Sequence, residues 1–163
     1  MNLLAKLGLG LGMMVAAVAG RGFVPTNLGD RTVGVAVGDR DMAEARAKAL
    51  STIANFWSAY DHPTGAETNL ALKVAISDAG KVEHFWLTAI TDRNGQLSGK
   101  IDNKPEFVTN VTNGQRYAFS ADQVSDWMFV RNGKIVGNET MRPLLKHMPT
   151  DEANRYRVML ESP

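Results

Sequence analysis

The sequence feature that most constrains the fold is a strict alternation of side chains from Asn69 to Ile76. The larger apolar side chains fall on one face, and small or polar ones on the other: Leu70, Leu72, Val74 and Ile76 against Asn69, Ala71, Lys73 and Ala75. This is the period of a half-buried strand. Asp78-Ala79-Gly80 then supplies turn residues, and Val82–Ile90 runs on as an apolar stretch. The two segments predict an antiparallel hairpin whose second strand, apolar on both faces, is central in its sheet.

Strand patterns occur on both sides of this hairpin. One strand pattern precedes the hairpin, at residues 31–37. Four follow it, at residues 96–101, 115–119, 124–130 and 134–136, and residues 106–111 form a short edge segment. Asn132-Gly133 is the pair that a type I′ hairpin turn favours. Successive strands joined by short turns predict a meander.

Helical patterns precede and follow the strands. Asp41 and Glu44 have the spacing of a capping box. Behind them, apolar residues recur every three or four positions as far as Tyr60, which predicts one helix of about five turns. His62-Pro63 ends it, because the residue before proline avoids helical geometry. Two further helical segments are expected, at residues 140–147 and 151–160.

The expected fold class is therefore α+β. One long N-terminal helix packs against a curled antiparallel sheet of about six short strands, and helices follow at the C-terminus. Residues 31–163 form a single domain, since this length supports one hydrophobic core and is too short for two.

The N-terminus has the pattern of a secretory signal peptide. A positive Lys6 precedes an uncharged apolar run from Leu7 to Val18, and Ala17-Val18-Ala19 provides the small residues of a cleavage site. This predicts a signal peptide at residues 1–19, an exposed leader at 20–30, and a periplasmic or secreted product. An uncleaved anchor is the alternative, but the run is shorter than the ~20 apolar residues of a spanning helix. No stable membrane insertion is expected after cleavage.

Composition excludes several classes of function. The chain contains no cysteine, which excludes disulfides, thiolate catalysis and Cys-ligated zinc. Its formal charge is +1, and loss of Lys6 with the signal peptide brings it to zero. Nucleic-acid binding draws most of its affinity from Lys and Arg at phosphates, so no nucleic-acid partner is expected. Nothing in the sequence indicates a cofactor.

His84, next to Glu83 in the second hairpin strand, is the best candidate for a catalytic base. A base needs a second group within hydrogen-bond reach, and Asp126 or Glu139 could provide it if the strands bring them together. A structural histidine is the favoured alternative. Ser98 and Ser125 have no recognisable histidine partner. No metal site is expected, because the spacing of the histidines and of the aspartates Asp122 and Asp126 matches no zinc or calcium motif.

The segment from Val124 to Arg142 contains the remaining candidates. The favoured interpretation is architectural: Trp127 fills the core, Asp126 accepts hydrogen bonds from a turn, Asn138 caps a helix and Arg142 pairs with a carboxylate. The alternative is a shallow cleft. Its binding residues would be Trp127, Asn138, Thr140 and Arg142.

Several short elements resemble the YegJ-like bacterial domain of unknown function. They are Val82-Glu83-His84 with Trp86, Asn103 and Pro105, Val124-Ser125-Asp126-Trp127-Met128, Gly133-Lys134, and Gly137-Asn138 with Thr140 and Arg142. The likeness covers residues 41–148, and Glu139 departs from it where an aromatic residue is expected. The resemblance implies a fold and no established activity.

Three functions are compatible with these observations. The leading hypothesis is an exported, non-catalytic domain that binds an unknown protein or envelope ligand, such as an inhibitor or immunity-type protein. The alternative is a small hydrolase or lyase acting on an envelope polymer through His84 and Asp126. A third is a folding or assembly accessory that uses residues 106–111 as an exposed strand edge.

Overall fold

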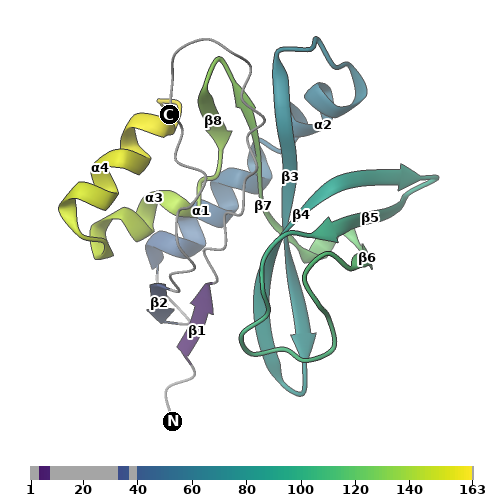
Figure 1. Ribbon diagram of the computed structural model, residues 1–163, viewed down its shortest axis with the longest axis horizontal. Coiled ribbons are helices and arrows are strands. Elements are labelled where there is room, and N and C mark those ends of the chain that lie inside the picture. Colours follow the sequence, from purple (N-terminus) through teal and green to yellow (C-terminus); the bar gives the residue numbers. More distant parts are fainter. Residues whose placement is uncertain (1–3, 8–32, 37–39, 163) are drawn as a thin grey trace.

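The computed structural model describes residues 4–7, 33–36 and 40–162 (Figure 1). Its helices are α1 (Arg40–Ser51), α2 (Ala54–Asp61), α3 (Met141–Leu144) and α4 (Thr150–Met159), with short 3-10 turns η1 (Ala121–Gln123) and η2 (Leu145–His147). Its strands are β1 (Leu4–Leu7), β2 (Val33–Ala36), β3 (Glu67–Asp78), β4 (Lys81–Arg93), β5 (Gln96–Ile101), β6 (Arg116–Phe119), β7 (Val124–Arg131) and β8 (Lys134–Gly137). The α+β class is confirmed.

The N-terminal predictions fall mostly outside the described residues. Only β1 of the predicted signal peptide is described, and it pairs antiparallel with β2, which occupies the strand predicted at 31–37. The signal peptide, the leader and export therefore stay predictions. No helix in the described part of the chain is long and apolar enough to cross a membrane.

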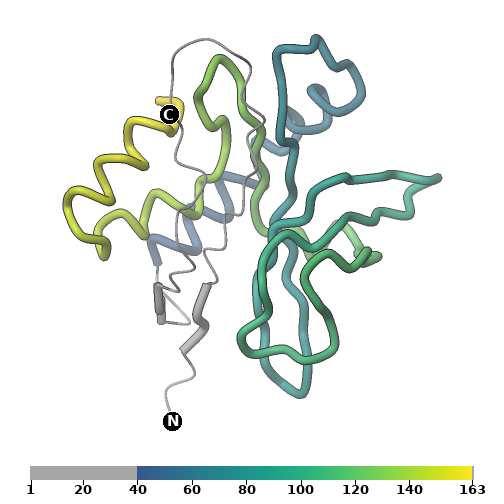
Figure 2. Tube along the Cα trace, in the orientation of Figure 1, coloured from purple at the N-terminus to yellow at the C-terminus, as the bar shows by residue number. Residues whose placement is uncertain are grey.

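The main sheet has six antiparallel strands in the order β6-β5-β4-β3-β7-β8. The predicted meander is correct from β3 to β6. After β6 the chain returns to the middle of the sheet, and β7 pairs with the free side of β3 (Figure 2). β3 and β4 are long rather than short, at 12 and 13 residues. The Asn132-Gly133 turn is confirmed, because both residues have the positive φ of a type I′ turn.

The central strands of the sheet are covered on both faces, so they separate two clusters of buried apolar side chains. The first cluster contains Phe56 of α2, Phe85 of β4, and Trp127 with Phe129 of β7. The second contains Trp86 and Met128 of the sheet with side chains of α3 and α4, among them Tyr156, and with Leu160 just after α4. Helix α1 contributes to both clusters, through Ala49 and Met42 respectively.

The single helix expected from residue 41 to residue 60 is not confirmed, because two helices cover this range. In a continuous helix the Ala49 carbonyl would accept the amide of Ile53. Here it accepts the Thr52 amide at 3.2 Å, the Thr52 hydroxyl at 3.2 Å and the Trp127 indole N–H at 2.8 Å. Local hydroxyl bonds of this kind compete with helical ones. The break therefore separates α1, over β7, from the aromatic helix α2.

Residues 106–111 do not form the predicted edge strand. The buried carboxylate of Glu83 accepts the backbone N–H groups of Glu106, Phe107 and Val108 at 2.9–3.2 Å. These donors are thereby unavailable to a sheet ladder, and Val108 packs into the first cluster. The prediction that this segment offers a strand edge to a partner is wrong.

The two edges of the sheet differ. At the β8 edge, Ile135 bridges to Leu160, and its carbonyl accepts the Glu161 amide at 2.8 Å. At the other edge, no strand among the described residues pairs with the outer side of β6. An unpaired strand edge is a site for added strands.

Candidate functional site

A group of buried polar side chains lies on the sheet face that carries the second apolar cluster. Its members, called here the Lys73 cluster, are Lys73 of β3, His84 of β4, Ser125 and Asp126 of β7, and Thr140 after β8. The strand register explains the grouping, because Lys73 lies between Trp86 and Asp126 on its two neighbours, and Ala75 lies beside His84. Ser125 joins them because the β3–β7 register shifts at this point, and such a bulge turns a side chain toward the other face.

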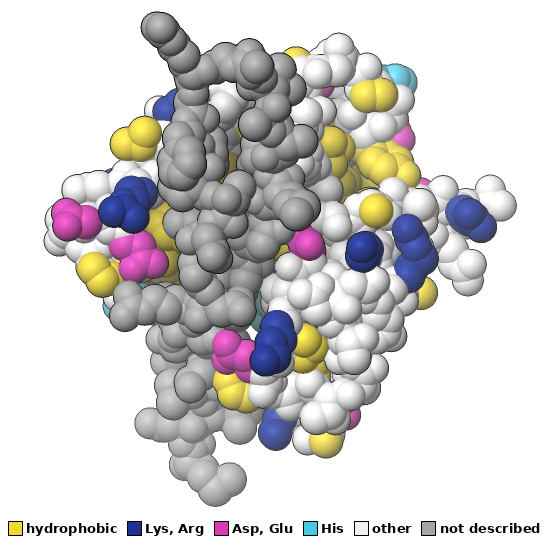
Figure 3. Space-filling view, viewed as in Figure 1, with side chains coloured by type: hydrophobic (Ala, Val, Ile, Leu, Met, Phe, Trp, Pro, Cys, Tyr) yellow, Lys and Arg dark blue, Asp and Glu magenta, His cyan; other side chains and the backbone are white. Residues whose placement is uncertain are grey.

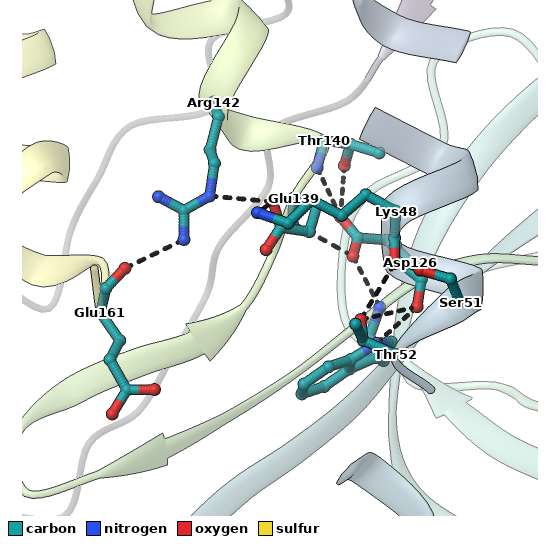
Figure 4. A network of polar contacts seen from close by, with 10 residues as sticks. Lys48, Ser51, Thr52, Asp126, Glu139, Thr140, Arg142 and Glu161 are labelled. Atoms are coloured by element: carbon teal, nitrogen blue, oxygen red, sulfur yellow. Dashed lines mark hydrogen bonds and ion pairs between the residues drawn. The ribbon is translucent and has the colours of Figure 1, made fainter. Parts of the chain in front are cut away.

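Asp126 is an anchor for the turn that follows β8. Its side chain is 0% exposed, and its carboxylate accepts the backbone N–H of Trp127, Glu139 and Thr140 and the hydroxyl of Thr140, at 2.6–3.2 Å (Figure 4). Burial raises the pKa of this carboxyl, while the Lys73 charge and the Thr140 hydrogen bonds lower it. The prediction that Asp126 accepts hydrogen bonds from a turn is confirmed.

Lys73 is almost completely buried beside this carboxylate. Its ammonium donates to the Thr140 hydroxyl at 2.8 Å and lies 5.1 Å from the centre of the Trp86 ring. Thr140 in turn donates to Asp126 at 2.6 Å, so one hydroxyl links the two charges. Burial lowers the pKa of Lys73 to about 8, although the Asp126 carboxylate opposes this shift. The sequence pattern placed Lys73 on the polar face of the strand, but α1 and α3 cover that face.

His84 has a serine partner, contrary to the prediction that Ser125 lacks one. The His84 Nδ1 and Ser125 Oγ atoms are 2.8 Å apart, and the Ser125 hydroxyl donates to the Lys73 carbonyl at 3.3 Å. Arg46 Nη2 lies 3.5 Å from His84 Nε2. A guanidinium can only donate, so Nε2 is the acceptor and Nδ1 carries the proton. In this tautomer His84 donates to Ser125 and does not take its proton.

The catalytic pairs proposed from the sequence are not formed directly. His84 and Asp126 share a face, but no hydrogen bond joins them, and Lys73 lies on the strand between theirs. Glu139 pairs instead with Arg142 at 3.0 Å and with Lys48 at 3.2 Å (Figure 4). The predicted pairing of Arg142 with a carboxylate is confirmed.

His84 makes the stability of the fold depend on pH. Burial, together with the charges of Lys73 and Arg46, lowers its pKa from 6.5 to about 3. Between these values the unfolded chain binds the proton and the folded chain does not, so stability falls as the pH drops below 6.5. We expect a slope of up to about 1.4 kcal/mol per pH unit, measured by urea unfolding. His84→Gln should flatten this part of the profile, whereas replacing the exposed His62 should not; an unchanged slope in His84→Gln would contradict the assignment.

Of the four predicted binding residues, Thr140 belongs to this cluster and the other three lie near it, and most of them are buried. Trp127 is 2% exposed and donates its indole N–H into the break between α1 and α2. Asn138 and Thr140 are also buried. The expected side-chain cap from Asn138 is not observed: its backbone carbonyl accepts the Met141 amide, and its side-chain nitrogen has no partner in the described structure. Arg142 spans from Glu139 to the Glu161 carbonyl, which it reaches at 3.0 Å.

The described residues contain no group of three His, Asp or Glu side chains that could hold a metal ion. His62 and His147 are exposed and lie on separate elements, while His84 is buried in the sheet. The Lys73 cluster brings together one carboxylate, Asp126, and one cationic side chain, Lys73, and a second cation, Arg46, lies at its edge. Such a set stabilises negative charge rather than binding a cation.

Comparison with known proteins supports the resemblance seen in the sequence. Residues 39–160 match the profile of a family described as uncharacterized protein conserved in bacteria (DUF2314). The chain belongs to this family. The match extends beyond residues 41–148 and includes α1 through α4.

Two curated relatives share parts of the DUF2314 chain. The uncharacterized protein YegJ of Escherichia coli (strain K12) is 46% identical over 90 residues, which cover 55% of this chain and 59% of the relative. A putative ankyrin repeat protein of Neisseria meningitidis serogroup B (strain ATCC BAA-335 / MC58) is 32% identical over 74 residues, covering 45% of this chain and 29% of the relative. The chain thus spans less than two thirds of either relative. No solved structure matches it.

Three residues of the DUF2314 site were missed in the sequence. The alternation predicts a solvated strand face for Lys73, the sequence shows no histidine partner for Ser125, and the helical pattern gives Arg46 no role in a site. A usable signal existed for Lys73 alone, because Ala71 and Ala75 flank it on the same face and leave room for covering helices. The position of Ser125 beside His84 depends on a bulge, and no sequence pattern predicts that bulge.

Proposed function

We propose that this DUF2314 protein is an exported, non-catalytic domain that binds a protein or envelope ligand, with an inhibitor or immunity-type role. The observation that supports the proposal is the set of hydrogen bonds that the Asp126 carboxylate accepts from the protein itself. Oδ1 accepts the Glu139 amide and Oδ2 accepts the amide and hydroxyl of Thr140, and the adjacent Lys73 is held through Thr140. A carboxylate whose oxygens both accept hydrogen bonds from the backbone stabilises the fold, and neither oxygen is directed at a substrate.

A second candidate function is hydrolysis or elimination on an envelope polymer. The 2.8 Å contact between His84 and Ser125 favours it, because a serine beside a histidine is the basic unit of nucleophilic catalysis. The low pKa of His84 and its proton on Nδ1 oppose it. An alkyl fluorophosphonate distinguishes the two: labelling of the folded chain that is lost in Ser125→Ala would support the enzyme, and the binding proposal expects no labelling.

Export is tested by the mature N-terminus. We expect the chain expressed in a Gram-negative host to be recovered from the periplasm, with intact mass and N-terminal sequencing placing Gly20 first. Replacing Ala17 and Ala19 with bulky residues should block processing, because signal peptidase requires small side chains there. Recovery of the unsubstituted chain from the host cytoplasm at its full length would contradict export.

Binding is tested by capture from periplasmic extract. Gly20–Pro163 carrying a C-terminal tag should retain a stoichiometric partner across several salt concentrations, with the tag alone on the same resin as the control. Retention of no component under all conditions would count against the proposal.

A further inference from the structure

The outer face of the strands β4, β5 and β6 is hollowed and polar. A cavity of about 500 Å³ there is lined by Thr91 and Arg93 of β4, Gln96 and Ser98 of β5, and Arg116 and Ala118 of β6. Leu97, between Gln96 and Ser98 in β5, also borders it. The register pairs Thr91 with Ser98, Ser98 with Ala118, and Arg93 with Gln96, so these side chains share one face of the sheet. The opposite face carries Leu97 and Phe119, which belong to the first apolar cluster.

The charge of this hollow is positive and uncompensated. Arg93 and Arg116 line it, no acidic side chain does, and neither arginine forms an ion pair within the described structure. Figure 3 shows dark blue side chains gathered over the β4–β5 hairpin. Lys100 extends the same face toward Arg116, although Asp102 lies close enough to interact with it.

Arg116 is held in place from one side. Its Nη1 donates to the Ala89 carbonyl at 3.3 Å, the Ser98 hydroxyl at 3.1 Å and the Thr91 hydroxyl at 3.4 Å. These bonds use one of its three nitrogens and leave Nε and Nη2 for a ligand. A guanidinium presented in this way suits a carboxylate, which it binds through two parallel hydrogen bonds.

The hollow lies beside the unpaired edge of the sheet. Arg116 and Ala118 belong to β6, whose outer side has no strand partner in the described part of the chain. A strand added along this edge would alternate its side chains between the two faces. Every second side chain would then lie over the hollow, next to Arg116.

We propose that β6 and this hollow bind an extended acidic segment of a partner protein, which adds to the sheet as a seventh strand. Backbone hydrogen bonds to β6 supply affinity, and carboxylates of the segment bind Arg116 and Arg93, as expected for strand addition. The inference rests on the proposed binding function and names the chemistry of the partner. It also replaces residues 106–111 as the strand edge that a partner would use.

The test is an NMR titration of the folded chain with three synthetic peptides. The first alternates valine and glutamate, the second alternates valine and lysine, and the third is the valine–glutamate peptide with alternate amides methylated on the edge that would pair. We expect shifts centred on β6 with the first peptide, none with the lysine peptide, and loss of binding on methylation. Equal binding of the methylated peptide, shifts away from β6, or no binding of the first peptide would each overturn the proposal.

Two variants and a matched control sharpen the result. Arg93→Gln should weaken the valine–glutamate peptide about tenfold or more, because it removes a charged hydrogen-bond donor. The Arg93 side chain makes no hydrogen bond in the described structure, so its loss should not disturb folding. Arg116→Gln should behave alike, whereas Lys81→Gln, at the far end of β4, should bind normally. Equal affinity in Arg93→Gln and the unmodified chain would contradict the assigned carboxylate site.

The outcome separates this inference from the proposed function. A partner captured from periplasmic extract that binds the arginine variants normally would leave the binding function standing and remove the β6 site. Peptide binding at β6 without any captured partner would preserve the site and count against the proposed role in the envelope.

Discussion

Replacing Asp126 with alanine is expected to lower the free energy of unfolding by about 3–5 kcal/mol, because it leaves a buried ammonium without its partner. Lys73 is 2% exposed, and the one described hydrogen bond of its ammonium leads through Thr140 to the Asp126 carboxylate. The same substitution leaves the amides of Glu139 and Thr140 without their acceptor. Urea unfolding at neutral pH, followed by tryptophan fluorescence, measures the change.

A double-mutant cycle isolates the interaction between the two charges. Lys73→Met should cost less than Asp126→Ala, since it removes the buried ammonium and leaves the four hydrogen bonds of Asp126 in place. In the Lys73→Met background, the cost of losing Asp126 should be smaller by roughly 0.5–3 kcal/mol, the range expected for residues in one hydrogen-bond network. An equal cost of Asp126→Ala in both backgrounds would show that the charges are not coupled.

Gly137→Ala is expected to destabilise the fold by about 3 kcal/mol or more, the range of overpacking combined with backbone strain. Gly137 has φ +79°, where a side chain is strained, and an added Cβ would lie 2.8 Å from Trp127 Cε3 and closer still to the Trp127 carbonyl oxygen. That oxygen accepts the Asn138 amide at 2.8 Å and so fixes the turn that Asp126 anchors. The thermal midpoint and urea unfolding should both register the loss.

Gly133→Ala is the matched control for this substitution. Gly133 has a similar φ of +72°, but an added Cβ would meet nothing within 4 Å. Its cost should be about 1–2 kcal/mol, the strain of a left-handed residue alone. If the two variants were equally stable, the close approach of Gly137 to Trp127 would contribute nothing to the destabilisation caused by Gly137→Ala.

The features that could be predicted from the sequence are those encoded by neighbouring residues. The β3–β4 hairpin follows from an uninterrupted alternation and its Ala79-Gly80 turn, and the β7–β8 hairpin follows from Asn132-Gly133. Asp126 as a turn acceptor and Arg142 as a carboxylate partner were also predictable. Both residues act on groups supplied by the turn that follows β8 and the start of α3.

The features that could not be predicted depend on distant residues. The single helix from 41 to 60 is divided where Trp127, 78 positions away, donates to the Ala49 carbonyl. β7 could equally have paired with β6 and extended the meander. An alternating pattern predicts that a segment is a strand, but it does not predict which strand it pairs with. The contact between His84 and Ser125 requires the β7 bulge as well as the return of β7 to β3. Local periodicity predicts neither the bulge nor the pairing of β7 with β3.

The return of β7 to the middle of the sheet governs the order in which the sheet can be completed. Strands β3 to β6 leave the ribosome first and can pair with one another through short turns. One side of the twelve-residue β3 then stays open until residues 124–131 have been synthesised. A nascent or truncated chain that stops before β7 therefore exposes a long central strand with unpaired backbone groups, the kind of edge on which chains associate. Because β7 closes this gap, the chain needs protection from self-association until its C-terminal quarter is available.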